Sequence, residues 1–455
     1  MIMQDIKALK AENIFVVLSL IMGLFYLVIN PPFQAPDEAQ HMFKMWGYTQ
    51  GTLRFKVLQN YTGDVLPLSL IKLSRYEFMR GDTNKKITVN EIKQSLNVKL
   101  DKENKAFYTF NPTSYTPVSY FPSFLLLWVM KLLNIPPLVM MYMLRLCSLF
   151  LYTGLMYYAI KIMPVKKWLF FTLALLPMPL YTAASVSTDA LFTGIVFIFI
   201  AYCSRLALRP RKGRVLRRKH YLVIGVLSLL ISICKFAYMP LVLLYFIIPK
   251  DRFSSQKHRY GAFFAILLIN LLVTGMFLDY SINAAKGLNT GTQGYEAGFM
   301  ISFIMQRFDW FVGFICKTLS VKTHEYIAGF IGKLGWYDTV LPSSVLKNFL
   351  AVILLSAVFK TKGKERVFNL KSKLIFALIF VCCFFIIMCS AFILFQCHPV
   401  ICGVQGRYFM PVAPLLLLMF DNKKLVATKL PLFLAAVIPL LSIGAFWALI
   451  TRFYG

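Results

Sequence analysis

Long apolar runs recur along nearly the whole chain and restrict its fold class more than any other feature. A helix needs about 20 apolar residues to cross the hydrocarbon core of a bilayer. Hydrophobic residues make up 58% of the 455 positions and charged residues only 15%, and a soluble domain could not bury that much apolar surface. We therefore predict one all-α, polytopic membrane domain over residues 1–455. The apolar runs lie at 14–29, 118–133, 138–162, 168–184, 190–204, 221–249, 260–278, 343–359, 374–395, 410–420 and 430–450.

Lysines and arginines gather in the short segments between these runs. Residues 205–220 contain eight of them and no acid, and weaker basic loops lie at 160–167, 250–259, 360–373 and 421–429. The positive-inside rule places such loops in the cytoplasm. Because this pattern accounts for the net charge of +30, we do not expect nucleic acid as a partner. Membrane lipids are the expected surroundings of the chain.

The basic loops also fix the parity of the crossings. With the N-terminus in the cytoplasm, residues 118–133 cannot cross, and we expect them to be re-entrant or to lie in the outer interface. Residues 221–249 would form a single helix of about 43 Å, which exceeds the roughly 30 Å hydrocarbon core. A hairpin that turns near Lys235 is the better interpretation. The resulting count is about eleven crossings in a cell-membrane protein.

Two long segments are expected on the outer side, at residues 30–117 and 279–342. Within the second, residues 301–320 contain Arg307, Asp309 and Lys317, so an interfacial helix is expected there instead of a crossing. A shorter outer element spans residues 395–411. Its two cysteines, Cys397 and Cys402, could form a disulfide or could hold a metal with His398, and both alternatives stay open.

The first outer segment opens with a group of titratable residues directly after the first apolar run. Helical spacing would place Asp37 and Glu38 on the same face as His41. A carboxylate beside apolar surface can have its pKa raised toward working pH, which suits a general base. The alternative is a helix N-terminal cap, which the Pro36-Asp37-Glu38 sequence also fits. A divalent cation held by these three residues remains possible, and the metal question stays open.

Three cations lie where a membrane chain would not normally place them. Lys235 lies within an apolar run, where a lysine costs roughly 2.5 to 3.5 kcal/mol at the bilayer centre unless it faces protein, water or an anion; it could also snorkel to the headgroups. Arg407 could bind phosphate oxygens bidentately or anchor a helix end. Arg145 is a third phosphate candidate, although a buried pair with Asp189 or Glu38 would explain it as well.

Several motifs, taken in order, resemble a bacterial membrane-protein family catalogued as a domain of unknown function. That family is distantly similar to the GT-C glycosyltransferases, which move a sugar from a polyprenyl-phosphate or polyprenyl-diphosphate donor to an acceptor on the outer side of the membrane. The motifs are PPFQAPDEAQHMFKMWGYTQG, NPTSYTPVSYFPSFL with MLRL, STDA, CKFAYMPL, GKLGWYDTVLP and GVQGRYFMPVAPLL.

The resemblance implies roles for particular residues. Asp37 and Glu38 match the catalytic acid of the first outer loop in GT-C enzymes, and Asp189 matches a second outer acid. Lys235 and Arg407 fit the cations that receive the donor phosphate, with Arg145 as the third candidate. The remaining supporting or acceptor-binding candidates are His41, Gln405, Tyr408, Trp336 and Asp338, and Tyr337 accompanies the last two in a possible aromatic platform for a sugar.

The function that follows is an inverting, GT-C-like membrane glycosyltransferase. It would use a polyprenyl-phosphate-linked sugar to modify a cell-envelope glycan or a lipid-linked acceptor, with its active site outside the cytoplasm. The sequence does not establish a need for any cofactor, and a divalent cation stays an open alternative. The competing hypotheses are a transporter or flippase of a lipid-linked glycan, and a noncatalytic partner in envelope assembly. An enzyme should gather its charged residues in one outer cavity, whereas a transporter should distribute them through the membrane depth.

Overall fold

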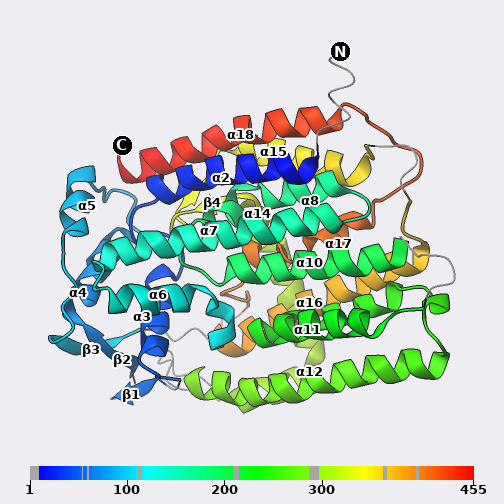
Figure 1. Ribbon diagram of the computed structural model, residues 1–455, viewed down its shortest axis with the longest axis horizontal. Helices are drawn as coiled ribbons and strands as arrows, with labels where there is room; N and C mark the ends of the chain where they lie inside the picture. Colours follow the sequence, from blue (N-terminus) through cyan, green and yellow to red (C-terminus); the bar gives the residue numbers. More distant parts are fainter. Residues whose placement is uncertain are drawn as a thin grey trace.

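The computed structural model describes residues 10–53, 55–58, 61–110, 115–208, 215–285, 297–361, 366–395 and 399–455. These residues are mostly helical, with little sheet. Most of the helices lie side by side along the long axis of the molecule (Figure 1). The predicted polytopic helical architecture is therefore confirmed in its broad form.

Six helices in the described residues are long and apolar enough to cross a membrane. Apart from Arg145 in the first half of α7, their middle parts contain no charged residue, and their buried residues form one continuous apolar core with the shorter helices. These six are α2 (Ala11–Ile29), α7 (Pro137–Ile162), α10 (Asp189–Leu208), α12 (Gln256–Ala285), α16 (Leu370–Phe395) and α18 (Leu430–Phe453).

Shorter helices fill the space between the long ones. Two of them, α8 and α9, are halves of one apolar run that breaks before Pro177, because proline lacks the N–H that would continue the helix. The predicted hairpin over residues 221–249 is confirmed, since the chain breaks at Lys235 and η4 packs against α11. The bounds are α8 (Lys167–Ala174), α9 (Pro177–Ala183), α11 (Arg218–Cys234), η4 (Phe236–Ile247), η5 (Lys250–Arg252), α15 (Ser343–Val358) and α17 (Ala413–Leu418).

Residues 118–133 form only the short elements η3 (Pro117–Tyr120) and α6 (Ser123–Leu132). Ten residues of helix cover about 15 Å, so α6 is too short to cross alone.

The prediction for residues 301–320 was wrong in its bounds. The chain there forms two helices, α13 (Ala297–Gln306) and α14 (Phe308–Ile331), which meet at Arg307 at an angle of 98°. Arg307 leaves the helical conformation, with φ −127° and ψ 51°. Beyond this bend α14 continues eleven residues past the predicted end. Its first half buries only Phe311, Ile315 and Thr318, which share one face, and more of its last turns is buried. Whether this broken pair lies in the interface stays a prediction.

Residues 30–117, predicted to lie on the outer side, depart from the all-α prediction. They contain α3 (Glu38–Thr49) and a three-stranded antiparallel sheet, seen at the lower left of Figure 1. Val65 of the central strand pairs with Phe107. Gly63 lies so close to the Tyr108 carbonyl that a Cβ atom would clash with it. The other elements are β1 (Lys56–Leu58), β2 (Tyr61–Pro67), α4 (Leu68–Ile71), η2 (Lys72–Met79), α5 (Val89–Leu96) and β3 (Lys105–Thr109), and a small hairpin, β4 (Lys333–Leu334) with β5 (Thr339–Val340), lies in the second outer segment.

The basic loops meet at one end of the helices, which we call the basic end. Lys167 pairs with Glu12 across 3.1 Å, and the Lys166 ammonium donates to the last carbonyls of α15, 2.6 Å from that of Ala357. The Leu216 amide donates to the Arg252 carbonyl. We call the opposite end, which carries α3 and the three-stranded sheet, the site end. The sequence predicted that these basic loops share one side of the membrane, and their contacts do place them at one end of the helices.

Candidate functional site

Asp37 lies at a sharp turn between α2 and α3. Its φ of 62° is left-handed, and its carbonyl accepts the first helical hydrogen bond, from the His41 amide. Its side chain makes no capping hydrogen bond. The carboxylate is therefore not held in place by capping the helix, which was the alternative role. The carboxylate instead points to Arg407, with Oδ2 3.2 Å from Nη2, and remains 39% exposed.

Arg407 joins Asp37 to a second ion pair. Its Nη1 lies 3.5 Å from Oδ2 of Asp189, and Oδ1 of Asp189 accepts a 2.6 Å hydrogen bond from the Lys235 ammonium. Four charged side chains from distant parts of the chain thus form one line: Asp37, Arg407, Asp189 and Lys235. The last three are only 8%, 16% and 12% exposed, so Asp37 is the most open member of this charged line. The sequence predicted all four residues as site candidates.

Breaks in helical structure position the charged line. Asp189 is the first residue of α10, and Lys235 lies at the extended break between α11 and η4. Arg407 lies in η6 (Gly406–Phe409). Gly406 approaches α14 so closely that a Cβ atom would clash with the Tyr326 carbonyl. This close contact of two backbones brings Arg407 to its place.

Aromatic rings surround the two cations. The Lys235 ammonium lies 5.2 Å from the ring centroid of Tyr115 and 5.0 Å from that of Phe192. The Arg407 guanidinium lies 5.6 Å from both the Tyr337 and the Tyr408 centroids. Such contacts stabilise a cation without neutralising it. Sequence reasoning missed Tyr115 and Phe192, which belong to no charged pattern, and named Tyr337 only as a companion of Trp336.

Several buried polar atoms around the charged line have no hydrogen-bond partner among the described residues. They are the Arg407 Nε, the Gln405 Oε1, the Tyr337 hydroxyl and the Thr188 Oγ1. Buried polar groups in proteins are nearly always paired. Four exceptions beside the same ion pairs indicate a place where groups from outside the chain complete the hydrogen bonding.

Glu38 and Arg145 form a separate, fully buried pair, which corrects two predictions. Both side chains are 0% exposed, and Arg145 Nη2 lies 2.7 Å from Glu38 Oε2. Arg145 donates its remaining hydrogen bonds to Glu38 Oε1 and to the carbonyls of residues 27, 30 and 31. All five guanidinium N–H groups therefore have acceptors. Arg145 has no donor left for a phosphate, and Glu38 is inaccessible to an acceptor; the alternative of a Glu38–Arg145 pair is confirmed.

His41 and Lys44 lie on the buried face of α3. The His41 Nδ1 is 2.8 Å from the Tyr120 hydroxyl, and burial lowers the pKa of His41 to about 4, so the ring is neutral at pH 7. Burial also lowers the pKa of Lys44 to about 7, and its ammonium donates to the Tyr115 carbonyl. The predicted metal trio does not converge, because Glu38 turns to Arg145; within the described part of the chain no three potential ligands cluster.

Trp336 and Asp338 do not form the open platform that the sequence suggested. The Trp336 Nε1 donates to the Phe33 carbonyl across 2.9 Å, and the Arg80 guanidinium covers its ring at 3.8 Å from the centroid. Asp338 forms a buried ion pair with Arg452, 2.7 Å between Oδ2 and Nη2. These residues therefore hold the second outer segment against the first segment and α18.

Glu77 is a site neighbour that sequence reasoning missed. Burial raises the pKa of its carboxyl, and the nearby Asp37 charge raises it further, while Arg80 opposes both. Its Oε1 is buried and has no partner among the described residues. A single glutamate in a polar stretch gives no sequence signal, so only the fold could reveal it.

The predicted pairing of Cys397 with Cys402, and the alternative metal site with His398, fall on positions outside the described residues. Cys402 itself is half-buried with a free thiol.

Comparison with known proteins gives one match. The family described as "Predicted membrane protein (DUF2142)" matches residues 20–416. No curated protein and no solved structure matches the chain. The matched region includes the four residues of the charged line.

Proposed function

The chain belongs to the DUF2142 family of predicted membrane proteins, and we propose that it is a GT-C-like glycosyltransferase. It transfers a sugar from a polyprenyl-phosphate-linked donor to a cell-envelope glycan or a lipid-linked acceptor. The observation that carries this proposal is the charged line, in which the partly exposed Asp37 carboxylate contacts the buried Arg407, and Asp189 links Arg407 to the buried Lys235. A carboxylate to accept a proton and cations to bind a leaving phosphate are the two groups that this reaction needs.

The proposed reaction assigns one role to each part of the line. Asp37 accepts the proton from the acceptor hydroxyl as its oxygen attacks the anomeric carbon. The bond from that carbon to the phosphate oxygen breaks, and polyprenyl phosphate leaves with the electron pair. Arg407 and Lys235 bind the phosphate oxygens, and Asp189 holds both cations in position. Attack opposite the leaving phosphate inverts the anomeric configuration.

The unpartnered atoms support this assignment. The Arg407 Nε is buried and makes no hydrogen bond within the described residues, so a phosphate oxygen could accept from it. The Tyr337 hydroxyl, also without a partner among the described residues, could donate to the same phosphate, whereas the unpartnered Gln405 Oε1 is an acceptor and suits a sugar hydroxyl. A phosphate that binds there would complete hydrogen bonding that the chain alone leaves incomplete.

An apolar hollow lined by residues close in sequence to Asp189 and Lys235 supports a donor that carries a lipid. Its volume is about 320 Å³. Leu191 lies two residues after Asp189 and Leu230 five before Lys235, so the hollow lies near the charged line. The lining residues are Pro117, Val118, Phe121, Phe124, Leu191, Ile195 and Leu230.

We extend the proposal to the topology. Eleven segments would cross: the six long helices, the α8–α9 pair, α11, η4, α15 and the segment that includes α17. The basic end would face the cytoplasm, by the positive-inside rule, and the site end would face the extracytoplasmic side. The GT-C-like fold and the count of eleven are parts of this proposal.

The charge distribution favours an enzyme over a transporter or flippase. Residues 146–160, 190–204 and 374–395 of the long helices contain no charged residue, and Arg145, which lies deeper in α7, is saturated by Glu38 and backbone carbonyls. A pathway for a charged headgroup through the membrane would need polar or charged side chains along its depth. The charged line instead lies at one end. A noncatalytic assembly partner would not need the exposed carboxylate.

The deciding experiment is a transfer assay with the purified protein in proteoliposomes. A radiolabelled sugar on polyprenyl phosphate is supplied with envelope acceptors, and labelled acceptor is measured. Donor-dependent labelling is the expected result. Movement of intact lipid-linked glycan between leaflets, without labelled acceptor, would establish the flippase instead. The third outcome is a protein that neither transfers the sugar nor moves the lipid-linked glycan. If donor analogues also fail to protect Asp37 from carboxyl modification, the noncatalytic assembly role is the remaining hypothesis.

A further inference from the structure

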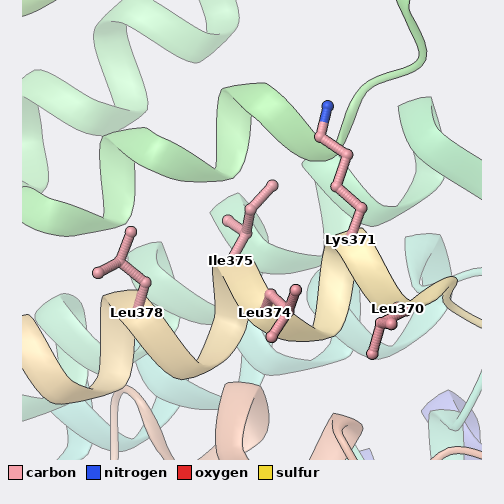
Figure 2. Close-up of a pocket in the computed structure, with 5 residues that line it drawn as sticks. All are labelled: Leu370, Lys371, Leu374, Ile375 and Leu378. Carbon is pink, nitrogen blue, oxygen red and sulfur yellow. The ribbon is translucent and has the colours of Figure 1, made fainter.

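A groove on α16 lies at the basic end, far along the chain from the charged line. It is a hollow of about 400 Å³ lined by Leu370, Lys371, Leu374, Ile375 and Leu378. Figure 2 shows these side chains along one stretch of the helix, with the Lys371 ammonium extended away from the helix axis toward a neighbouring segment. Leu370, Leu374 and Leu378 are 72%, 61% and 53% exposed. The groove is thus an open apolar surface with a cation at its head.

Arg259, in the first turn of α12, lies near this cation. Its side chain is 1% exposed, and its guanidinium rests 5.4 Å from the Phe246 centroid and 5.2 Å from that of Phe253. One Nη donates weakly to the Phe246 carbonyl at 3.4 Å. The Nε is buried without a partner among the described residues. A buried guanidinium with an unused donor is costly unless an anion or water completes it.

The charges around Lys371 are positive. The groups that act on its ammonium are Arg259 and Lys250. A further buried arginine at this end, Arg252, also has two guanidinium nitrogens without partners among the described residues. Asp251 beside it is exposed. Like charges repel one another, and an anion bound at Lys371 would offset that repulsion.

We propose that the α16 groove and the Arg259–Lys371 pair form a binding site for an anionic phospholipid of the leaflet at the basic end. The phosphate of the headgroup binds at the Lys371 ammonium, on which the buried Arg259 charge also acts, and an acyl chain lies along Leu370, Leu374 and Leu378. The apolar lining distinguishes this occupant from free phosphate, which would gain nothing from the leucines. Basic pockets between membrane helices are a known form of site for anionic lipids. This site does not depend on the proposed transfer activity.

The test measures lipid binding to the purified full chain. The protein, kept in a zwitterionic detergent, is titrated with dioleoyl phosphatidylglycerol, with dioleoyl phosphatidylcholine and with inorganic phosphate, and bound lipid is read by native mass spectrometry. Lys371→Gln removes the accessible cation and should fold normally. Leu374→Asn makes the groove polar. Lys423→Gln removes an exposed lysine at the same end and is the matched control.

Wild-type protein should bind phosphatidylglycerol in preference to phosphatidylcholine. Lys371→Gln should weaken that binding about fivefold, in keeping with the contribution of one basic residue to anionic-lipid binding. Leu374→Asn should weaken it as well, and Lys423→Gln should not. Equal binding of both lipids, full competition by inorganic phosphate, or unchanged binding by Lys371→Gln would each overturn the proposal.

Discussion

Arg407 lies 3.2 Å from Asp37 although 370 residues separate them in the chain. The contact joins the turn after the first long helix to the short η6 helix near the end of the chain. Because the same guanidinium reaches Asp189, one side chain organises both carboxylates of the site.

Asp37→Asn should abolish sugar transfer and leave folding intact. Loss of a general base typically costs about 10²- to 10⁴-fold in rate. Asparagine tolerates the left-handed backbone at this position, so the turn should persist. Transfer rate and thermal unfolding of the purified variant are the two measurements. Turnover close to that of the wild type would exclude Asp37 as the base.

Arg407→Lys should raise the KM for the donor about tenfold and lower kcat. Lysine cannot reproduce two separate contacts to two carboxylates, nor offer a bidentate pair to phosphate. Arg307→Lys is the matched control, since Arg307 pairs with Asp309 on the surface, where the two side chains are 49% and 70% exposed. Equal kinetics in the two variants would show that Arg407 does not contact the donor.

Glu38→Gln should destabilise the protein by about 3 to 5 kcal/mol, because it leaves the buried Arg145 guanidinium without its counter-charge. The comparison is Glu325→Gln, which removes a half-exposed partner of Lys333 and should cost about 0 to 1 kcal/mol. Denaturant unfolding of both variants checks the difference. If Glu38→Gln unfolds like the control, the pair is not structural.

Acid should destabilise the wild type partly through His41. Its pKa is about 4 in the folded protein and about 6.5 when unfolded, so below pH 6.5 the unfolded state binds the extra proton. The free energy of unfolding is unaffected by this group above pH 6.5. It decreases as the pH drops from 6.5 toward 4, by up to about 3 kcal/mol, because protonation of His41 favours the unfolded state. Unfolding temperatures of the wild type and His41→Gln, measured from pH 7 to pH 4, should show a flatter profile for the variant. Parallel profiles would contradict the assignment.

Gly406→Ala should lower activity without touching any substrate group. The new methyl group would clash with the Tyr326 carbonyl, and the shift that relieves the clash would move Arg407 from its carboxylates. Gly313→Ala in α14 is the control, because a Cβ there meets open space. Loss of transfer in the first variant alone is expected, and equal activity in both would show that η6 has room to adjust.

Part of the site could be predicted because its signals are local. Lys235 was conspicuous as a lysine in an apolar run, and Asp37 and Asp189 as acids beside such runs. Arg145 gave an equally conspicuous signal and was misassigned as a phosphate ligand. Its role depends on Glu38 and on three backbone carbonyls, which no local pattern specifies. The orphaned oxygen of Glu77 lay in a polar stretch without any distinguishing pattern.

The sequence by itself determined that the chain is a polytopic helical membrane protein and which loops share an end, because hydrophobic run length and the placement of basic residues act locally along the chain. Only the tertiary structure decided which charges meet. Whether an arginine keeps an unpartnered nitrogen, as Arg407 does among the described residues, or is saturated like Arg145 depends on distances between residues more than a hundred positions apart. Those distances follow from helix packing and from breaks at single residues, such as Lys235 and Gly406.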